Sequence, residues 1–113
     1  MDADERQLLL TTAWIFARHG QSARARTMCE ALAEDDPRDG VVAAALAELL
    51  LRDGEAEPAL AVLRAADFPP ELARAAALLE TRALAQLGRR EDADRRWRRF
   101  VASQRGPDRS WVG

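Results

Sequence analysis

The chain has 113 residues and a formal net charge of −2 at pH 7, which fits one domain with a modest core and predicts no strong attraction to nucleic acid or anionic membranes. Alanine, leucine, arginine and glutamate fill 65 of the 113 positions, whereas isoleucine occurs once and tyrosine never. Because strands favour β-branched and aromatic side chains, this composition excludes an all-β or α/β fold and predicts an all-α chain.

Apolar residues recur at helical spacing along most of the chain and predict six helices. These cover residues 4–18, 22–34, 41–53, 56–66, 71–87 and 90–104. The first begins next to Asp2 and Asp4 and ends near Arg18, an order of charges that the helix dipole favours. Pro58 and Pro70 lie in first turns, where the missing N–H does not weaken a helix.

The last predicted helix closes a single domain, which we place at residues 1–104. The tail over 105–113 contains Gly106-Pro107 and is too short for another helix, and its Trp111 has no assigned environment. The apolar residues of the helix form one stripe. The stripe consists of Ala93, Trp97, Phe100 and Val101. We expect Trp97 and Phe100 to lie in the core.

An internal repeat organises these helices into pairs. Two residue types recur three times at a constant spacing of 34 residues. These are the glycines Gly20, Gly54 and Gly88 and the alanines Ala25, Ala59 and Ala93. Each glycine lies between two helical runs, which predicts a tight turn with a positive φ. Each alanine is expected where the second helix of a pair crosses the first, because a methyl group lets two backbones approach closely.

The spacing and the helix–turn–helix order of each unit resemble the tetratricopeptide repeat. The first repeat carries the resemblance in Phe16, Gly20, Ala25, Leu32 and Pro37, the second in Leu46, Ala47, Gly54 and Ala59, and the third in Leu84, Gly88 and Ala93. In the third repeat, Glu80 and Thr81 replace the expected leucine and small residue. The resemblance implies three stacked hairpins in a short right-handed solenoid, with repeats over about 6–39, 40–73 and 74–107.

The first helix of each hairpin lines the concave surface in such repeats, so the resemblance also implies a groove that binds a partner protein. Its residues would be Leu10, Trp14, Ala17, Arg18, Val41, Ala44, Glu48, Leu51, Leu78 and Arg82. Trp14 is the predicted anchor, because an amphipathic ring offers a large contact area at low entropic cost. A core position for Trp14 is the alternative. Arg18, Glu48 and Arg82 are expected to supply polar selectivity at the rim.

The helix over 4–18 is apolar on more sides than packing requires, from Leu8 to Phe16. No preceding hairpin covers the surplus, and exposed patches of this kind usually mark an interaction surface. We therefore expect self-association when the partner is absent.

No constellation of residues predicts catalysis, a cofactor or a metal site. Cys29 is the only cysteine and falls on a core position of its helix, which favours a buried, inert thiol over a nucleophile. His19 has no serine, cysteine or paired carboxylate at a fixed offset. The acidic run Glu34-Asp35-Asp36 and the nearby Asp39 lack the loop of a calcium hand, so we expect a solvated loop.

Charge is distributed unevenly along the chain. Residues 89–113 contain eight arginines and four acids, a net charge of +4, whereas residues 1–88 carry −6. We expect a solvated basic face, with docking on an acidic partner as the alternative; nucleic acid is disfavoured because no aromatic residues are interleaved for stacking. No apolar run is long enough for a bilayer, and the acidic start over 1–5 differs from a signal peptide, so a cytoplasmic protein without membrane insertion is expected.

The three repeats and the spacing of residues in the first hairpin resemble the small YscY-type chaperones of bacterial type III secretion. The pattern includes Leu8-Leu9-Leu10, Trp14, Gly20, Cys29 and Pro37. This resemblance implies a cytoplasmic chaperone that binds a small secreted partner of the YscX type and delivers it to the export gate. Translocator chaperones of the same systems carry three such repeats but are usually longer at the N-terminus. A generic tetratricopeptide adaptor, or a fragment of a larger scaffold, is the other interpretation.

Overall fold

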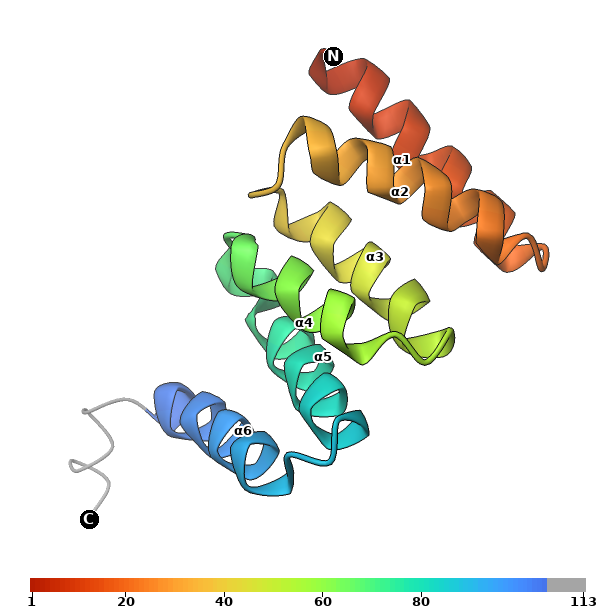
Figure 1. Ribbon diagram of the computed structural model, residues 1–113. Coiled ribbons are helices and arrows are strands. Elements are labelled where there is room, and N and C mark those ends of the chain that lie inside the picture. Colours follow the sequence, from red (N-terminus) through yellow and green to blue (C-terminus); the bar gives the residue numbers. More distant parts are fainter. Residues whose placement is uncertain (106–113) are drawn as a thin grey trace.

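A computed structural model describes residues 1–105, which form six α-helices and one short 3₁₀ helix joined by turns (Figure 1). The helices are α1 (Ala3–Arg18), α2 (Ser22–Asp35), α3 (Gly40–Arg52), α4 (Ala56–Ala65), η1 (Pro70–Leu72), α5 (Ala73–Gln86) and α6 (Arg90–Arg105). All six predicted helices are confirmed, with bounds close to the predicted ones. The predicted start of the fifth helix lies in η1, after the Pro69-Pro70 pair.

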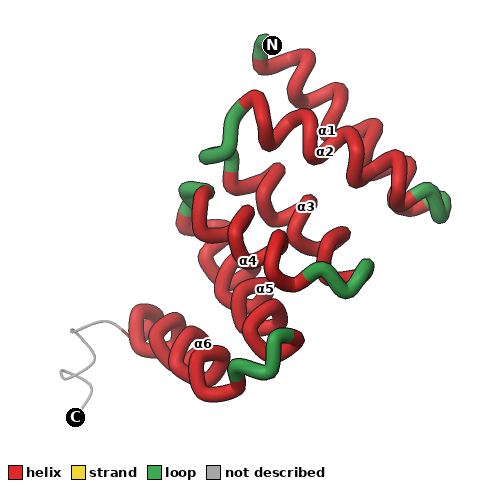
Figure 2. Tube along the Cα trace, viewed as in Figure 1, coloured by secondary structure: helices red, strands yellow, loops and turns green. Residues whose placement is uncertain are grey.

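No strand forms within residues 1–105, and the β-type pairing there is limited to an isolated bridge between Asp39 and Asp67 (Figure 2). The all-α prediction is therefore confirmed. Of the predicted tail, Arg105 is the last residue of α6, while residues 106–113, including Trp111, lie outside the described part.

The helices pack as three consecutive hairpins, α1 with α2, α3 with α4, and α5 with α6 (Figure 1). Between hairpins, α3 packs on α2 and α5 packs on both α4 and α3. The radius of gyration is 15.7 Å, above the roughly 13 Å expected for a compact domain of this length. The molecule is thus an elongated stack, in which consecutive hairpins pack on one another.

The three glycine turns have the same geometry, as the repeat predicts. Gly20, Gly54 and Gly88 have φ values of 77°, 77° and 79°. In the first turn, the N–H of Gln21 donates to the carbonyl of Phe16 over 2.9 Å, and the equivalent bonds form in the second and third turns. This bond is typical of the Schellman motif, which ends a helix and satisfies its last carbonyls. A residue with a Cβ would be strained at these three φ values.

The core is built largely from alanine and leucine. Ala25 and Ala59 are fully buried and Ala93 is 6% exposed, so the three repeated alanines all lie in the core. The largest side chains buried completely are Leu32, Leu63, Val42 and Cys29. The large apolar side chains of α1 contribute little to this core, since Leu8, Trp14 and Ile15 are exposed.

Two predictions about the core and the acidic loop were wrong. Trp97 and Phe100 are only half-buried and stack on each other, with ring centroids 5.3 Å apart; no further helix within the described residues covers them. Glu34, Asp35 and Asp36 are exposed, as expected, whereas Asp39 is half-buried at the end of the loop: its carboxylate accepts hydrogen bonds from the N–H groups of Val41 and Val42 and caps α3. Arg6 pairs with Asp39 and Asp35, over 2.8 and 2.6 Å.

Candidate functional site

The first helices of the three hairpins present equivalent positions on one side of the molecule. Two rows at the spacing of the repeat are Leu10, Ala44 and Leu78, and Trp14, Glu48 and Arg82. An ion pair of 2.6 Å between Glu48 and Arg82 links α3 and α5 along the second row. The repeat thus aligns side chains from all three hairpins, as expected for a groove that crosses the stack.

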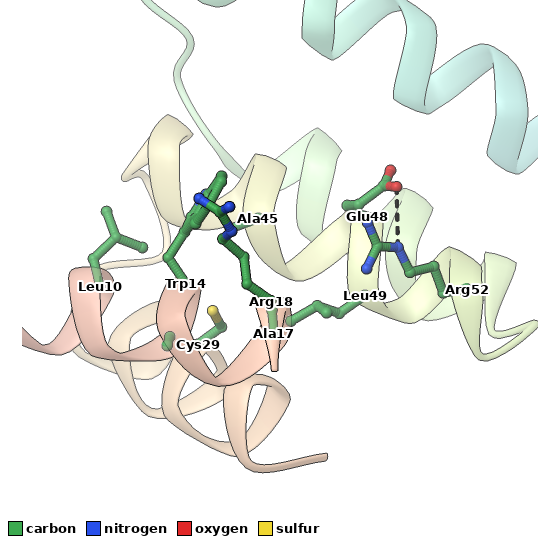
Figure 3. Close-up of a pocket in the computed structure, with 10 residues that line it drawn as sticks. Leu10, Trp14, Ala17, Arg18, Cys29, Ala45, Glu48, Leu49 and Arg52 are labelled. Carbon is green, nitrogen blue, oxygen red and sulfur yellow. Dashed lines mark hydrogen bonds and ion pairs between the residues drawn. The ribbon is translucent and has the colours of Figure 1, made fainter. Parts of the chain in front are cut away.

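A pocket of about 340 Å³ opens between α1 and α3 (Figure 3). Five predicted groove residues line it: Leu10, Trp14, Ala17, Arg18 and Glu48. Figure 3 shows Trp14 and Arg18 extending from α1 toward the side where α3 carries Ala45 and Glu48. Apolar side chains form most of this lining, and the charged groups lie at its edge.

Trp14 is the most exposed large apolar side chain of the pocket, with 58% of its surface accessible. The guanidinium of Arg18 lies over its ring, 5.1 Å from the centroid, in a cation–π contact that orients the indole. The core alternative for Trp14 is therefore wrong. An exposed ring held in one orientation loses little entropy when a partner covers it.

Glu48 is held between two arginines. Its carboxylate pairs with Arg52 over 3.3 Å on α3 and with Arg82 over 2.6 Å on α5. All three side chains remain at least one-third exposed, so a partner with polar groups can exchange contacts with them at modest cost. Arg82 itself lies outside the pocket lining.

The remaining predicted residues fall into two groups. Val41 and Leu78 are 48% and 41% exposed and Ala44 is half-buried, and all three lie outside the pocket lining. Leu51, in contrast, is 3% exposed and belongs to the core, so its assignment to the groove was wrong. The reason is that α5 packs on α3 at this point, where Gln86 donates a hydrogen bond to the carbonyl of Leu51.

Sequence reasoning missed several residues that shape the pocket. Ala13, Cys29, Ala45 and Leu49 also line it. Arg52, which the repeat places among the groove positions of the second hairpin, lines it as well. The helical spacing of Ala45, Leu49 and Arg52 places them on one side of α3. This spacing is the sequence pattern from which their place in the pocket could have been predicted. Cys29 comes from α2, and nothing in its local sequence indicates that it lies against the first helices.

The Cys29 thiol is buried, as predicted, with 1% of the residue exposed. Burial raises the pKa of the Cys29 thiol above its ordinary value, and the nearby carboxylate of Glu30 adds to this increase. A protonated thiol is a poor nucleophile and a poor metal ligand. Cys29 therefore serves as a small apolar side chain at the base of the pocket.

A second, larger cavity of about 1020 Å³ lies between α4 and α6. Six arginines line it, among them Arg64 and Arg99, with Glu80 and Asp92 as the acidic groups. Arg96 is shielded from solvent and lies 3.1 Å from Glu80, in a geometry that makes an ion pair but no hydrogen bond. The basic residues predicted to form a solvated face on α6 thus line a cavity shared with α4.

Membrane insertion and metal binding were considered for the described residues as well. Within residues 1–105, every helix falls short of the length or apolar character that a membrane span requires. In the same residues, no three His, Cys, Asp or Glu side chains gather where they could hold a metal ion.

No model of a known protein family matches this chain, and no curated protein matches it either.

Proposed function

We propose that this chain is a non-catalytic chaperone that binds a partner protein in the groove between α1 and α3. The observation that carries the proposal is the pocket between these helices, in which the exposed ring of Trp14 stands beside apolar walls. Arg18, Glu48 and Arg52 surround it with both signs of charge. Such a site suits an amphipathic helix or an extended segment that inserts apolar side chains and pairs polar groups at the rim.

The resemblance to YscY-type chaperones extends this proposal to type III secretion. On this proposal the protein is cytoplasmic, belongs to the tetratricopeptide repeats, captures a small secreted protein of the YscX type and delivers it to the export gate. Support comes from the three hairpins, from the identical glycine turns and from the order of residues in the first hairpin. A tetratricopeptide adaptor outside secretion would use the same groove.

Calorimetry with purified small secreted proteins encoded beside this chain tests the proposal. We expect one of them to bind, and Trp14→Ala to weaken binding by about 30-fold or more, since truncating a buried aromatic anchor typically has this effect. The matched control is the double variant Arg95→Ala with Arg99→Ala, at exposed positions of α6, which should change affinity only slightly.

Circular dichroism on each variant first establishes that the helices are intact. If folded Arg95/Arg99 variants lose more affinity than Trp14→Ala, the partner docks on α6 and the groove assignment is wrong. If the genes beside this chain encode no secretion component, the secretion role is wrong while the groove remains to be tested with other ligands.

A further inference from the structure

The stripe of α3 that packs on α2 shows how one hairpin covers the next. Val42, Leu46 and Leu49 lie on this stripe and are 2%, 3% and 6% exposed. At its end Asp53 pairs with Arg26 of α2 over 3.1 Å, which establishes that this side of α3 faces α2. At the equivalent apolar positions of α5, which follows α4, Ala76 and Ala83 are 3% and 0% exposed.

The equivalent stripe on α1, one repeat earlier, has no such cover. It consists of Leu8, Thr12, Ile15 and His19, and we call it the start stripe. Leu8 and Ile15 are 67% and 53% exposed, although α1 packs on α2. In residues 1–105 no helix occupies the place that α2 takes against α3.

Within residues 1–105, the other end of the stack also has no helix packed against it. Cys29 on α2 and Leu63 on α4 occupy equivalent positions, and each is 1% exposed because a following hairpin lies against it. The next equivalent residue is Trp97 on α6, which is only half-buried. Together with Asp94 and Val101, which correspond to Arg26 and Ala33 of α2, it forms what we call the end stripe.

The ion pair on α6 corresponds to one on α2, but the acidic and basic residues have exchanged places. Arg26 of α2 pairs with Glu30 one turn later, over 3.2 Å, and also with Asp53. The corresponding residues of α6, two repeats later, are Asp94 and Arg98, which pair over 2.9 Å. On α1, His19 takes the place of Asp53. An acidic group on the end stripe thus matches a group that can donate a hydrogen bond on the start stripe.

We propose that copies of this chain stack end to end, with α6 of one copy covering the start stripe of the next as α2 covers α3. Trp97 and Val101 would then pack on Leu8 and Ile15, and Asp94 would accept a hydrogen bond from His19. The basic segment of one copy, with +4 over residues 89–113, would meet the acidic remainder of its neighbour, which carries −6. Because the two surfaces differ, association is heterologous and produces open chains or a ring.

Light scattering coupled to size exclusion tests this proposal on the full chain. We expect the mass of the wild-type protein to rise with concentration up to the millimolar range. The start variant Leu8→Glu with Ile15→Glu should weaken association by about 30-fold or more, because it puts charges into an apolar contact. The control variant Ala31→Glu with Ala61→Glu adds the same charge at exposed positions of α2 and α4 and should associate like the wild type.

Mixing the start variant with an end variant tests whether the end stripe of one copy binds the start stripe of another. The end variant Val101→Glu, or the exposed Asp94→Arg if the former unfolds, should also be monomeric alone. An equimolar mixture of start and end variants should give a species of twice the mass of one chain and nothing larger, because each retains one competent stripe. A wild-type protein that stays monomeric at millimolar concentration overturns the proposal. So does an end variant that still dimerises, since α1 would then pair with itself.

Charge exchange tests the polar contact. Asp94→Arg should weaken association, and adding His19→Asp to the same chain should restore it, because the pair then reproduces Arg26 and Asp53. Failure of the second substitution to restore association, in chains shown to be folded by circular dichroism, rules out the register that we infer.

Discussion

The absence of a side chain at Gly40 lets the start of α3 touch the segment that leaves α4. A Cβ built at this position would lie 2.5 Å from the carbonyl oxygen of Asp67 and 3.0 Å from the ring of Phe68. We expect Gly40→Ala to lower the free energy of unfolding by about 1–3 kcal/mol, although alanine favours helices more than glycine does. Chemical denaturation measures the change. An unchanged or increased stability would show that the loop over 66–69 shifts without cost.

Asp39 contributes stability that depends on pH. Burial works to raise its pKa, but hydrogen bonds from Arg6 and from the N–H groups of Val42 and Val41 hold the pKa of Asp39 below its ordinary value. A lowered pKa means that this stability is complete above the unfolded value of about 3.9 and is lost as the pH falls through the folded pKa. Urea denaturation of the wild type and of Asp39→Asn, from neutral pH to pH 3, should show a smaller loss in the variant. Parallel curves would contradict the prediction.

Single residues also mark where sequence reasoning fails. The three turn glycines were predicted correctly because their repeat spacing and their φ requirement are local properties. Gly40 and Leu51 depend on contacts with Asp67 and Gln86, which belong to other helices or loops. Asp39 was misjudged because a cap and a solvated loop residue have the same local sequence; the ion pair with Arg6 distinguishes them only in three dimensions.

The attachment of α6 to α5 depends on the ion pair of Arg96 with Glu80. Its side chains are only 16% and 13% exposed, whereas the neighbouring Arg95 is 70% exposed and pairs with Asp92 within α6. We expect Arg96→Ala to lower the free energy of unfolding by about 1–3 kcal/mol, because Glu80 then loses its partner in a shielded place. Arg95→Ala removes the same charge and should stay within about 0.5 kcal/mol of the wild type.

Thermal denaturation of the two variants measures this difference. Equal shifts in both would mean that the net charge of α6, and not the contact with α5, governs stability. The pair also explains why the third repeat departs from the usual pattern at Glu80: a leucine there would leave Arg96 without a partner. The sequence showed the departure, but its reason required the position of α6.

Over the whole molecule, stability should be greatest where a hairpin is covered on both sides. The middle hairpin, α3 with α4, contacts α2 on one side and α5 on the other, and α3 contains eight of the buried residues, from Gly40 to Leu51. In α1, only Ala13 is buried. Repeat proteins approximate a row of units coupled to their neighbours, so native-state hydrogen exchange should give the slowest amides in α3 and the fastest among the helices in α1.

Slower exchange in α1 than in α3 would contradict this order. The measurement should be made at micromolar concentration and repeated at millimolar concentration. If copies stack end to end, the amides of α1 and α6 gain protection at the higher concentration while those of α3 do not. The start variant Leu8→Glu with Ile15→Glu serves as the reference without this gain.

The equal geometry of the three glycine turns means that the stack can be lengthened by whole hairpins. Gly20, Gly54 and Gly88 end their helices with the same bonds, so the chain reverses direction within each hairpin by the same local geometry. Duplicating residues 40–73, one full repeat, would add one more row of groove positions and preserve both terminal surfaces. Evolution by tandem duplication can therefore lengthen the ligand that such a protein accepts without redesigning its ends.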